Sequence, residues 1–290
     1  MIDVIRGITM TQMGINEIQD ISLAILKHID AFCRDKGLRY YLDSGTLLGA
    51  ARHNGFIPWD DDADIVMPRP DYERFVNEYI DCDEYRLYAP QKNNSFLPYA
   101  RLCEMKRTYF GQVSIWTRES PGVGVDIFPL DGAPDSAEEY DKLSVKIVTA
   151  RDKIWRLRSI LSGRIKIAFR KDLWGFAKDC IHYIVFRTYR ANPEFFIKRH
   201  INSIRKLRLK YPYEACNNCF YIVINSSRGK FWRKEWFSDA TYLDFCGERF
   251  PVPIGYDARL TAEYGDWRTP PPESERMGHS KCQTMYWRDK

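Results

Sequence analysis

An α+β fold, in which helices flank a mixed sheet, is the architecture that this 290-residue sequence predicts. Apolar residues recur at steps of three and four over residues 18–32, which indicates an amphipathic helix that ends at Gly37. Carboxylates alternate with apolar residues over 62–67, as expected for a strand. Residues 85–129 are rich in Tyr, Val, Ile, Phe and Trp and predict further strands.

The segments between these elements complete the predicted order. Residues 38–42 predict a short strand, which Ser44-Gly45 breaks just before a short helix over 46–52. Backbone N–H groups at such a turn can cradle a phosphate. An apolar stripe over 71–80 predicts the next helix.

Composition excludes several classes of protein. The chain is 44% hydrophobic and 29% charged, which excludes a disordered chain and a collagen-like repeat. No stretch has the ~18 apolar residues that a membrane-spanning helix needs, and the first residues do not resemble a secretory signal. We therefore expect a cytoplasmic protein, peripheral to the inner face of the membrane if the basic segment binds lipid.

That basic segment lies at 151–210, where 17 Lys and Arg face 4 Asp and Glu. Its apolar residues fall near helical spacing, which predicts basic amphipathic helices. Two interpretations stay open: a solvated helix face, or contact with an anionic membrane surface. Nucleic-acid binding is disfavoured, because no recognised module surrounds the segment.

Four carboxylates crowd into one short segment, at Asp60, Asp61, Asp62 and Asp64. They repel one another, and a cation would relieve that repulsion, although a solvated acidic loop is the simpler alternative. Alternate residues of a strand share a face, so Asp62 and Asp64 could reach one ion, with Asp126 joining from a neighbouring strand. The donors are all oxygen, which favours Mg²⁺, or Mn²⁺ in its place.

Eight cysteines are scattered along the chain, and we expect them to be reduced. Cys216 and Cys219 have the spacing of half a zinc site, but no second pair accompanies them. Two packed thiols are the alternative.

Residues 42–68 closely resemble the signature of the LicD family. Further stretches agree with it: 99–101 with Thr108, 125–131, and 264–272 followed by His279. The resemblance implies a nucleotidyltransferase-like fold, with a catalytic core at 1–140, a basic, mostly helical insertion at 141–215 and a C-terminal part of the domain at 216–290.

The resemblance also implies roles for individual residues. The metal carboxylates are Asp62, Asp64 and Asp126, with Asp126 as candidate base, and the remaining residues bind the donor or lie near it: Gly45, Thr46, Arg52, His53, Trp59, Arg101 and His279. Trp59 would stack on cytosine or enclose a quaternary ammonium. Structural alternatives stay open: Arg52 and Arg101 could pair with acidic residues, His53 could cap a turn, Trp59 could belong to the core, and His279 could be an ordinary surface residue.

The implied reaction moves a phospho-alcohol, most often phosphocholine, from a CDP-activated donor to a hydroxyl of a glycan or lipid-linked glycan, and releases CMP. CDP-choline is thus the favoured donor. Two other functions stay open: transfer of a nucleotidyl group from a nucleoside triphosphate, and a non-catalytic module that binds glycan or lipid.

Overall fold

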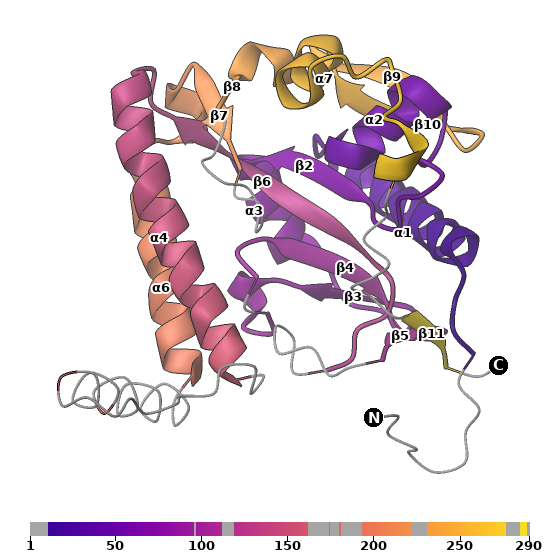
Figure 1. Cartoon of the computed structure of the whole chain (residues 1–290), viewed down its shortest axis with the longest axis horizontal. Coiled ribbons are helices and arrows are strands. Elements are labelled where there is room, and N and C mark those ends of the chain that lie inside the picture. Colours follow the sequence, from indigo (N-terminus) through magenta and orange to yellow (C-terminus); the bar gives the residue numbers. More distant parts are fainter. Residues whose placement is uncertain are drawn as a thin grey trace.

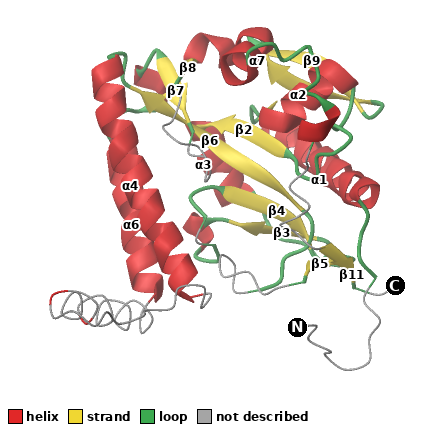
Figure 2. Ribbon diagram, viewed as in Figure 1, coloured by secondary structure: helices red, strands yellow, loops and turns green. Residues whose placement is uncertain are grey.

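A computed structural model of the chain describes residues 11–95, 97–111, 119–161, 174, 180, 193–221, 231–276 and 285–288. A twisted mixed sheet lies at its centre, with α1 (Ile15–Lys36) on one face and the helix pair α4 (Ala137–Leu161) and α6 (Pro193–Leu209) at the other side (Figure 1). The predicted α+β class is confirmed (Figure 2).

In the described part of the chain, the main sheet has the strand order β1-β2-β6-β4-β3, and β7 and β8 extend β6 at one end. Its strands are β1 (Tyr41–Leu42), β2 (Asp64–Pro68), β3 (Tyr85–Tyr88), β4 (Ala100–Glu104), β6 (Gly124–Ala133), β7 (Asn218–Phe220) and β8 (Trp232–Arg233). The pair β2 and β6 is parallel, whereas the other pairs are antiparallel. Strand β6 is therefore a central strand, and its partners change along its length.

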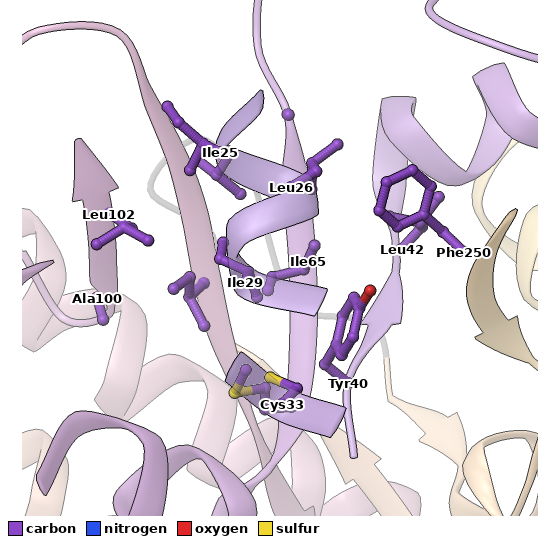
Figure 3. Packing of buried hydrophobic residues seen from close by; sticks show 14 of the residues in the cluster. Ile25, Leu26, Ile29, Cys33, Tyr40, Leu42, Ile65, Ala100, Leu102 and Phe250 are labelled. Atoms are coloured by element: carbon purple, nitrogen blue, oxygen red, sulfur yellow. The ribbon is translucent and has the colours of Figure 1, made fainter. Parts of the chain in front are cut away.

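Helix α1 packs its apolar stripe on one face of the sheet. Ile25, Leu26 and Ile29 are fully buried against residues of β1, β2 and β4, as Figure 3 shows. The helix ends where the sequence predicts, because Gly37 adopts a left-handed φ of 62° that a residue with a side chain rarely adopts.

The opposite face of the sheet carries a second core. Val66 and Phe128 point there, since alternate strand residues face opposite sides, and they pack with Tyr140 and Ile147 of α4 and Ile204 of α6. The first and last parts of the predicted insertion are thus helical and cover the sheet. Helix α4 runs across residue 140, and the division of the chain into three parts stays a prediction.

The remaining elements surround this frame. They are α2 (Ser44–His53), α3 (Arg69–Glu78), β5 (Thr108–Phe110), β9 (Ala240–Phe245), β10 (Glu248–Pro253), α7 (Tyr256–Tyr264), β11 (Met285–Trp287) and the short 3₁₀ turns Pro90–Lys92, Tyr213–Ala215, Lys234–Phe237 and Glu273–Glu275. Strands β9 and β10 form a hairpin, and β11 pairs with β5. Among the described residues, no helix combines the length and the apolar character required to cross a bilayer.

One local expectation needs correction. The sequence pattern places both Asp62 and Asp64 in a strand, but β2 begins only at Asp64. Asp62 lies in the irregular segment before it. Strand alternation therefore does not explain how Asp62 is oriented.

Candidate active site

The acidic segment is held against the start of α2 by backbone contacts. The N–H of Asp64 donates to Thr46 Oγ1 at 2.8 Å, and the N–H of Asp43 donates to the carbonyl of Asp64 at 3.1 Å. Gly45 allows the close approach, because a Cβ there would lie 2.4 Å from Asp60 Oδ2. Gly45 and Thr46 thus lie beside the carboxylates in space. The Asp60 carboxylate lies beside Gly45 in this arrangement.

A row of charged residues crosses three strands at this point. Asp64 of β2 is paired in register with Asp126 of β6, and Asp126 is paired with Arg101 of β4. Arg101 Nε lies 3.2 Å from Asp126 Oδ1. Gly124 leaves the space for this side chain, since a Cβ there would meet Arg101 Nε at 2.9 Å. The alternative in which Arg101 pairs with an acidic residue is therefore what the structure shows.

Burial and mutual repulsion make these carboxyl groups easier to protonate. The pKa of Asp64 is raised well above its ordinary value, first by burial and then by the charges of Asp62, Asp126, Asp60 and Asp43. Burial also raises the pKa of Asp126, but Arg101 and a hydrogen bond from Tyr99 act in the opposite direction. The charge of Asp62 acts on both Asp64 and Arg101, so Asp62 belongs to this group.

A second polar network is buried directly behind the turn. Asp43 Oδ2 accepts hydrogen bonds from Arg259 Nη2 and from the Tyr221 hydroxyl, both at 2.7 Å. The Tyr221 hydroxyl is also 2.9 Å from Ser44 Oγ. Asp43 and Arg259 are 0% and 1% exposed, and the Arg259 guanidinium lies 4.1 Å from the centre of the Trp232 ring. This network fixes the turn at which α2 begins.

A row of aromatic rings, tilted against one another, connects the two polar groups. Tyr99, which bonds to Asp126, lies 4.4 Å from Phe128, and Phe128 lies 5.1 Å from Tyr221, measured between ring centres. These rings also explain why one face of β6 is closed to water beside Asp126. The carboxylates of Asp43 and Asp126 are therefore positioned by one packed unit.

The other end of α2 carries two basic residues. Arg52 donates to His53 Nε2 at 3.0 Å and to the carbonyl of Trp267 at 2.9 Å. Trp59 packs partly against the core, and the His53 ring meets it edge-on, 6.2 Å away. Among the described residues, the partners of Arg52 are His53 and the Trp267 carbonyl, and no carboxylate pairs with it.

Some predicted residues are not brought into this site. His279 lies outside the described residues. Cys216 and Cys219 are free thiols, and Cys219 is buried in the second core, which agrees with packed thiols.

Sequence reasoning missed Asp43, Tyr99, Tyr221 and Arg259 as site residues. Asp43 and Tyr99 stood within the quoted stretches 42–68 and 99–101, whereas local sequence carries no signal for the other two.

The carboxylates can supply only part of the ligand shell of a divalent cation. Within the described ranges, no three His, Cys, Asp or Glu side chains are arranged as a group that could hold a metal ion. Mg²⁺, however, often takes one or two protein carboxylates and completes its shell with water and phosphate. Asp126 Oδ1 is buried and has no hydrogen-bond partner of proper geometry, and Asp64 lies at the paired position. These two carboxylates fit such a site, with Asp62 close by.

Comparison with known proteins identifies the family. The family model described as LicD/FKTN/FKRP, nucleotidyltransferase domain, matches residues 37–160. The lipopolysaccharide cholinephosphotransferase LicD of Haemophilus influenzae is 30% identical over 280 residues, which cover 93% of this chain and 97% of that protein. The human ribitol 5-phosphate transferase FKRP is 62% identical over 50 residues, 17% of this chain and 9% of that protein. The chain therefore belongs to the LicD family and is a phosphotransferase.

Proposed function

We propose that this protein transfers a phospho-alcohol from a CDP-activated donor to a hydroxyl group of a cell-surface glycan. Phosphocholine is the favoured phospho-alcohol. The observation that carries the proposal is the similarity to a lipopolysaccharide cholinephosphotransferase along nearly the whole chain. The similarity to a ribitol 5-phosphate transferase supports the same class of reaction with another alcohol. A glycan, free or lipid-linked, is then the acceptor.

The carboxylate group suits this chemistry. We assign Asp64 and Asp126, with Asp62 beside them, to one Mg²⁺ or Mn²⁺ ion. When bound, the ion would neutralise charge on the donor's phosphoryl oxygens. The row of Asp64, Asp126 and Arg101 places two carboxyl groups and one guanidinium side by side. A bound cation would favour the ionised form of both carboxyl groups. Thr46 and Asp43 fix the backbone of Asp64.

Asp126 is also our candidate for the base. The acceptor hydroxyl would form a bond to phosphorus and give its proton to Asp126, while the bond from phosphorus to the CMP oxygen breaks and CMP leaves. A raised pKa suits this role, because a base is most effective when its pKa lies near the working pH. Arg101 and a hydrogen bond from Tyr99 limit that rise in the pKa of Asp126.

The first test is release of CMP. The purified full chain would be incubated with Mg²⁺, a lipopolysaccharide-type glycan and CDP-choline, CDP-ribitol or CTP in parallel. We expect CMP from one of the two CDP donors and loss of this activity in Asp64→Asn. Asp35→Asn, a change at an exposed position of α1, is the matched control and should be as active as wild type.

The same experiment contains the contrary outcomes. Pyrophosphate released from CTP, without CMP from a CDP donor, would indicate nucleotidyl transfer. Glycan binding in calorimetry without release of either product would indicate a non-catalytic module. Equal CMP release by wild type and Asp64→Asn would reject the assigned site.

Membrane contact through 151–210 and a place at the inner face of the membrane also stay proposals. Most side chains of that segment lie outside the described residues. Flotation with anionic liposomes, compared with neutral ones, tests the contact directly: the protein should float only with the anionic vesicles.

A further inference from the structure

Arg276 and His53 contact the Trp59 ring, and Arg52 lies beside His53. Arg52 and His53 come from the end of α2, and Arg276 comes from the segment after the last 3₁₀ turn, more than 200 residues later. The Arg276 guanidinium lies over the Trp59 ring, 5.2 Å from its centre, while the His53 ring meets the edge. The chain thus brings two distant segments together to form one positive group, whose charge comes from the two guanidinium groups because His53 Nε2 accepts a hydrogen bond from Arg52.

Carboxylates hardly offset this positive charge. Arg52 uses Nε and Nη1 on His53 and on a carbonyl, and Arg276 uses Nε on the carbonyl of Pro271. Among the described residues, the one acidic partner is Glu273, 3.7 Å from Arg276 Nη1 with a side chain that is 91% exposed. Within the described ranges, the Nη2 groups of both arginines have no hydrogen-bond acceptor and could bind one from a ligand.

The groups also repel one another. Burial lowers the pKa of His53 first, and the charges of Arg52 and Arg276 lower it further. Burial likewise lowers the pKa of Arg52, and Arg276 adds to that effect. A bound anion would relieve this repulsion, just as a cation would at the carboxylates.

The same charges decide what Trp59 can bind. A quaternary ammonium such as choline would bring another positive charge beside Arg276 and Arg52, so this ring is a poor choline cage. One part of the ring is also already covered by Arg276. The basic residues beside Trp59 therefore favour an anionic ligand over a cationic one.

Arg52 and His53 are separated from the start of α2, where the carboxylates lie, by the length of that helix. Gly45 and Thr46 begin α2, and Arg52 and His53 end it, so about 10 Å of helix lies between them at ~1.5 Å per residue. None of the carboxylates at 60–64 is among the groups that alter the pKa of Arg52 or His53.

We propose that Arg52, His53 and Arg276, arranged around Trp59, form an anion-binding subsite that takes a phosphate or carboxylate group of a substrate. The anion belongs either to the CDP donor or to a charged sugar of the acceptor. Planar guanidinium groups bind both oxyanions through paired hydrogen bonds. The assignment to a substrate rests on the proposed function, whereas the subsite itself does not.

Titration with inorganic phosphate tests the subsite without any reaction. Isothermal calorimetry on the metal-free full chain would compare wild type, Arg276→Gln and Arg268→Gln. Arg268 is the matched control: it also lies over a tryptophan, Trp267, but it pairs with Asp257 and its side chain is 64% exposed. We expect Arg276→Gln to weaken phosphate binding by about tenfold or more and Arg268→Gln to leave it unchanged.

Equal phosphate binding by wild type and Arg276→Gln, or no binding by wild type, would overturn the subsite. Circular dichroism checks that each variant is folded, and Arg52→Gln gives a second, independent variant. A wild-type protein that releases no CMP would reject the proposed function and leave the phosphate titration as a valid test.

Steady-state kinetics then identify the substrate. A raised KM for CDP-choline in Arg276→Gln, with the acceptor KM unchanged, assigns the anion to the donor. The reverse result assigns it to the acceptor. Loss of phosphate binding with both KM values unchanged would overturn the assignment to a substrate.

Discussion

Arg259 of α7 donates a 2.7 Å hydrogen bond to Asp43, the residue that precedes α2, although 216 positions separate them in the chain. Both side chains are almost completely buried. Loss of one partner would leave the other charge unpaired away from water, which is far more costly than the net gain from the pair. This relationship ties the C-terminal part of the chain to the proposed phosphate turn.

Arg259→Met should therefore lower the free energy of unfolding by about 3–5 kcal/mol. Urea denaturation monitored by fluorescence would measure it. The double variant Asp43→Asn, Arg259→Met should recover part of the loss, because the unpaired carboxylate is gone. A single variant as stable as the wild type would show that the pair does not hold the turn.

Asp64→Asn should stabilise the metal-free protein at neutral pH while it abolishes transfer. The pKa of Asp64 is raised in the folded state, so the folded protein favours the protonated acid. Below about pH 4 the acid is protonated in both states, and the substitution should change little. As pH rises towards the raised pKa, the wild type loses stability relative to Asp64→Asn, so the variant should melt a few degrees higher.

Melting curves at pH 4 and pH 8, with and without Mg²⁺, would measure this difference. Mg²⁺ should raise the melting temperature of the wild type and have a smaller effect on the variant. The prediction is contradicted if Asp64→Asn melts lower than the wild type at pH 8 without metal.

Gly45→Ala should reduce activity more than stability. Its Cβ would displace the Asp60 carboxylate, the end of a side chain that can move, so the fold should tolerate the change. A shift of about 1 Å among the carboxylates can cost up to ~100-fold in rate.

Gly49→Ala in the same helix is the contrasting control. A Cβ at Gly49 would lie 2.4 Å from the backbone oxygen of Gly55, which cannot move without the chain. It should lower the free energy of unfolding by about 1–3 kcal/mol. CMP release and urea denaturation of both variants would be compared, and equal losses of stability would contradict the distinction.

Tyr99→Phe should move the acidic limb of the pH–rate profile to higher pH. The Tyr99 hydroxyl donates a hydrogen bond that lowers the pKa of Asp126, so its removal raises that pKa. A base must be ionised to accept a proton, and activity should therefore be lost at a higher pH as the solution is acidified. Tyr40→Phe, which removes a hydroxyl bonded to Asp30, should leave the profile unchanged. An unshifted profile in Tyr99→Phe would argue against Asp126 as the base.

The sequence by itself determined the features that depend on neighbouring residues. The helical period and Gly37 predicted α1 and its end, and the strand-rich residues predicted the central sheet. The crowding of Asp60 to Asp64 predicted a strongly negative segment, and the raised pKa of Asp64 agrees with it. The signature at 42–68 predicted the family. The metal, the donor and the roles of single residues stay predictions.

Only the tertiary structure decided which distant groups share a site. It paired Arg101 with Asp126, and it brought Arg259 to Asp43 and Arg276 to Trp59. The local period of apolar residues predicts which face of a helix is buried, because the residues of one face are three or four positions apart. A hydrogen bond between residues 43 and 259 depends on the path of the whole chain, and no local pattern specifies that path.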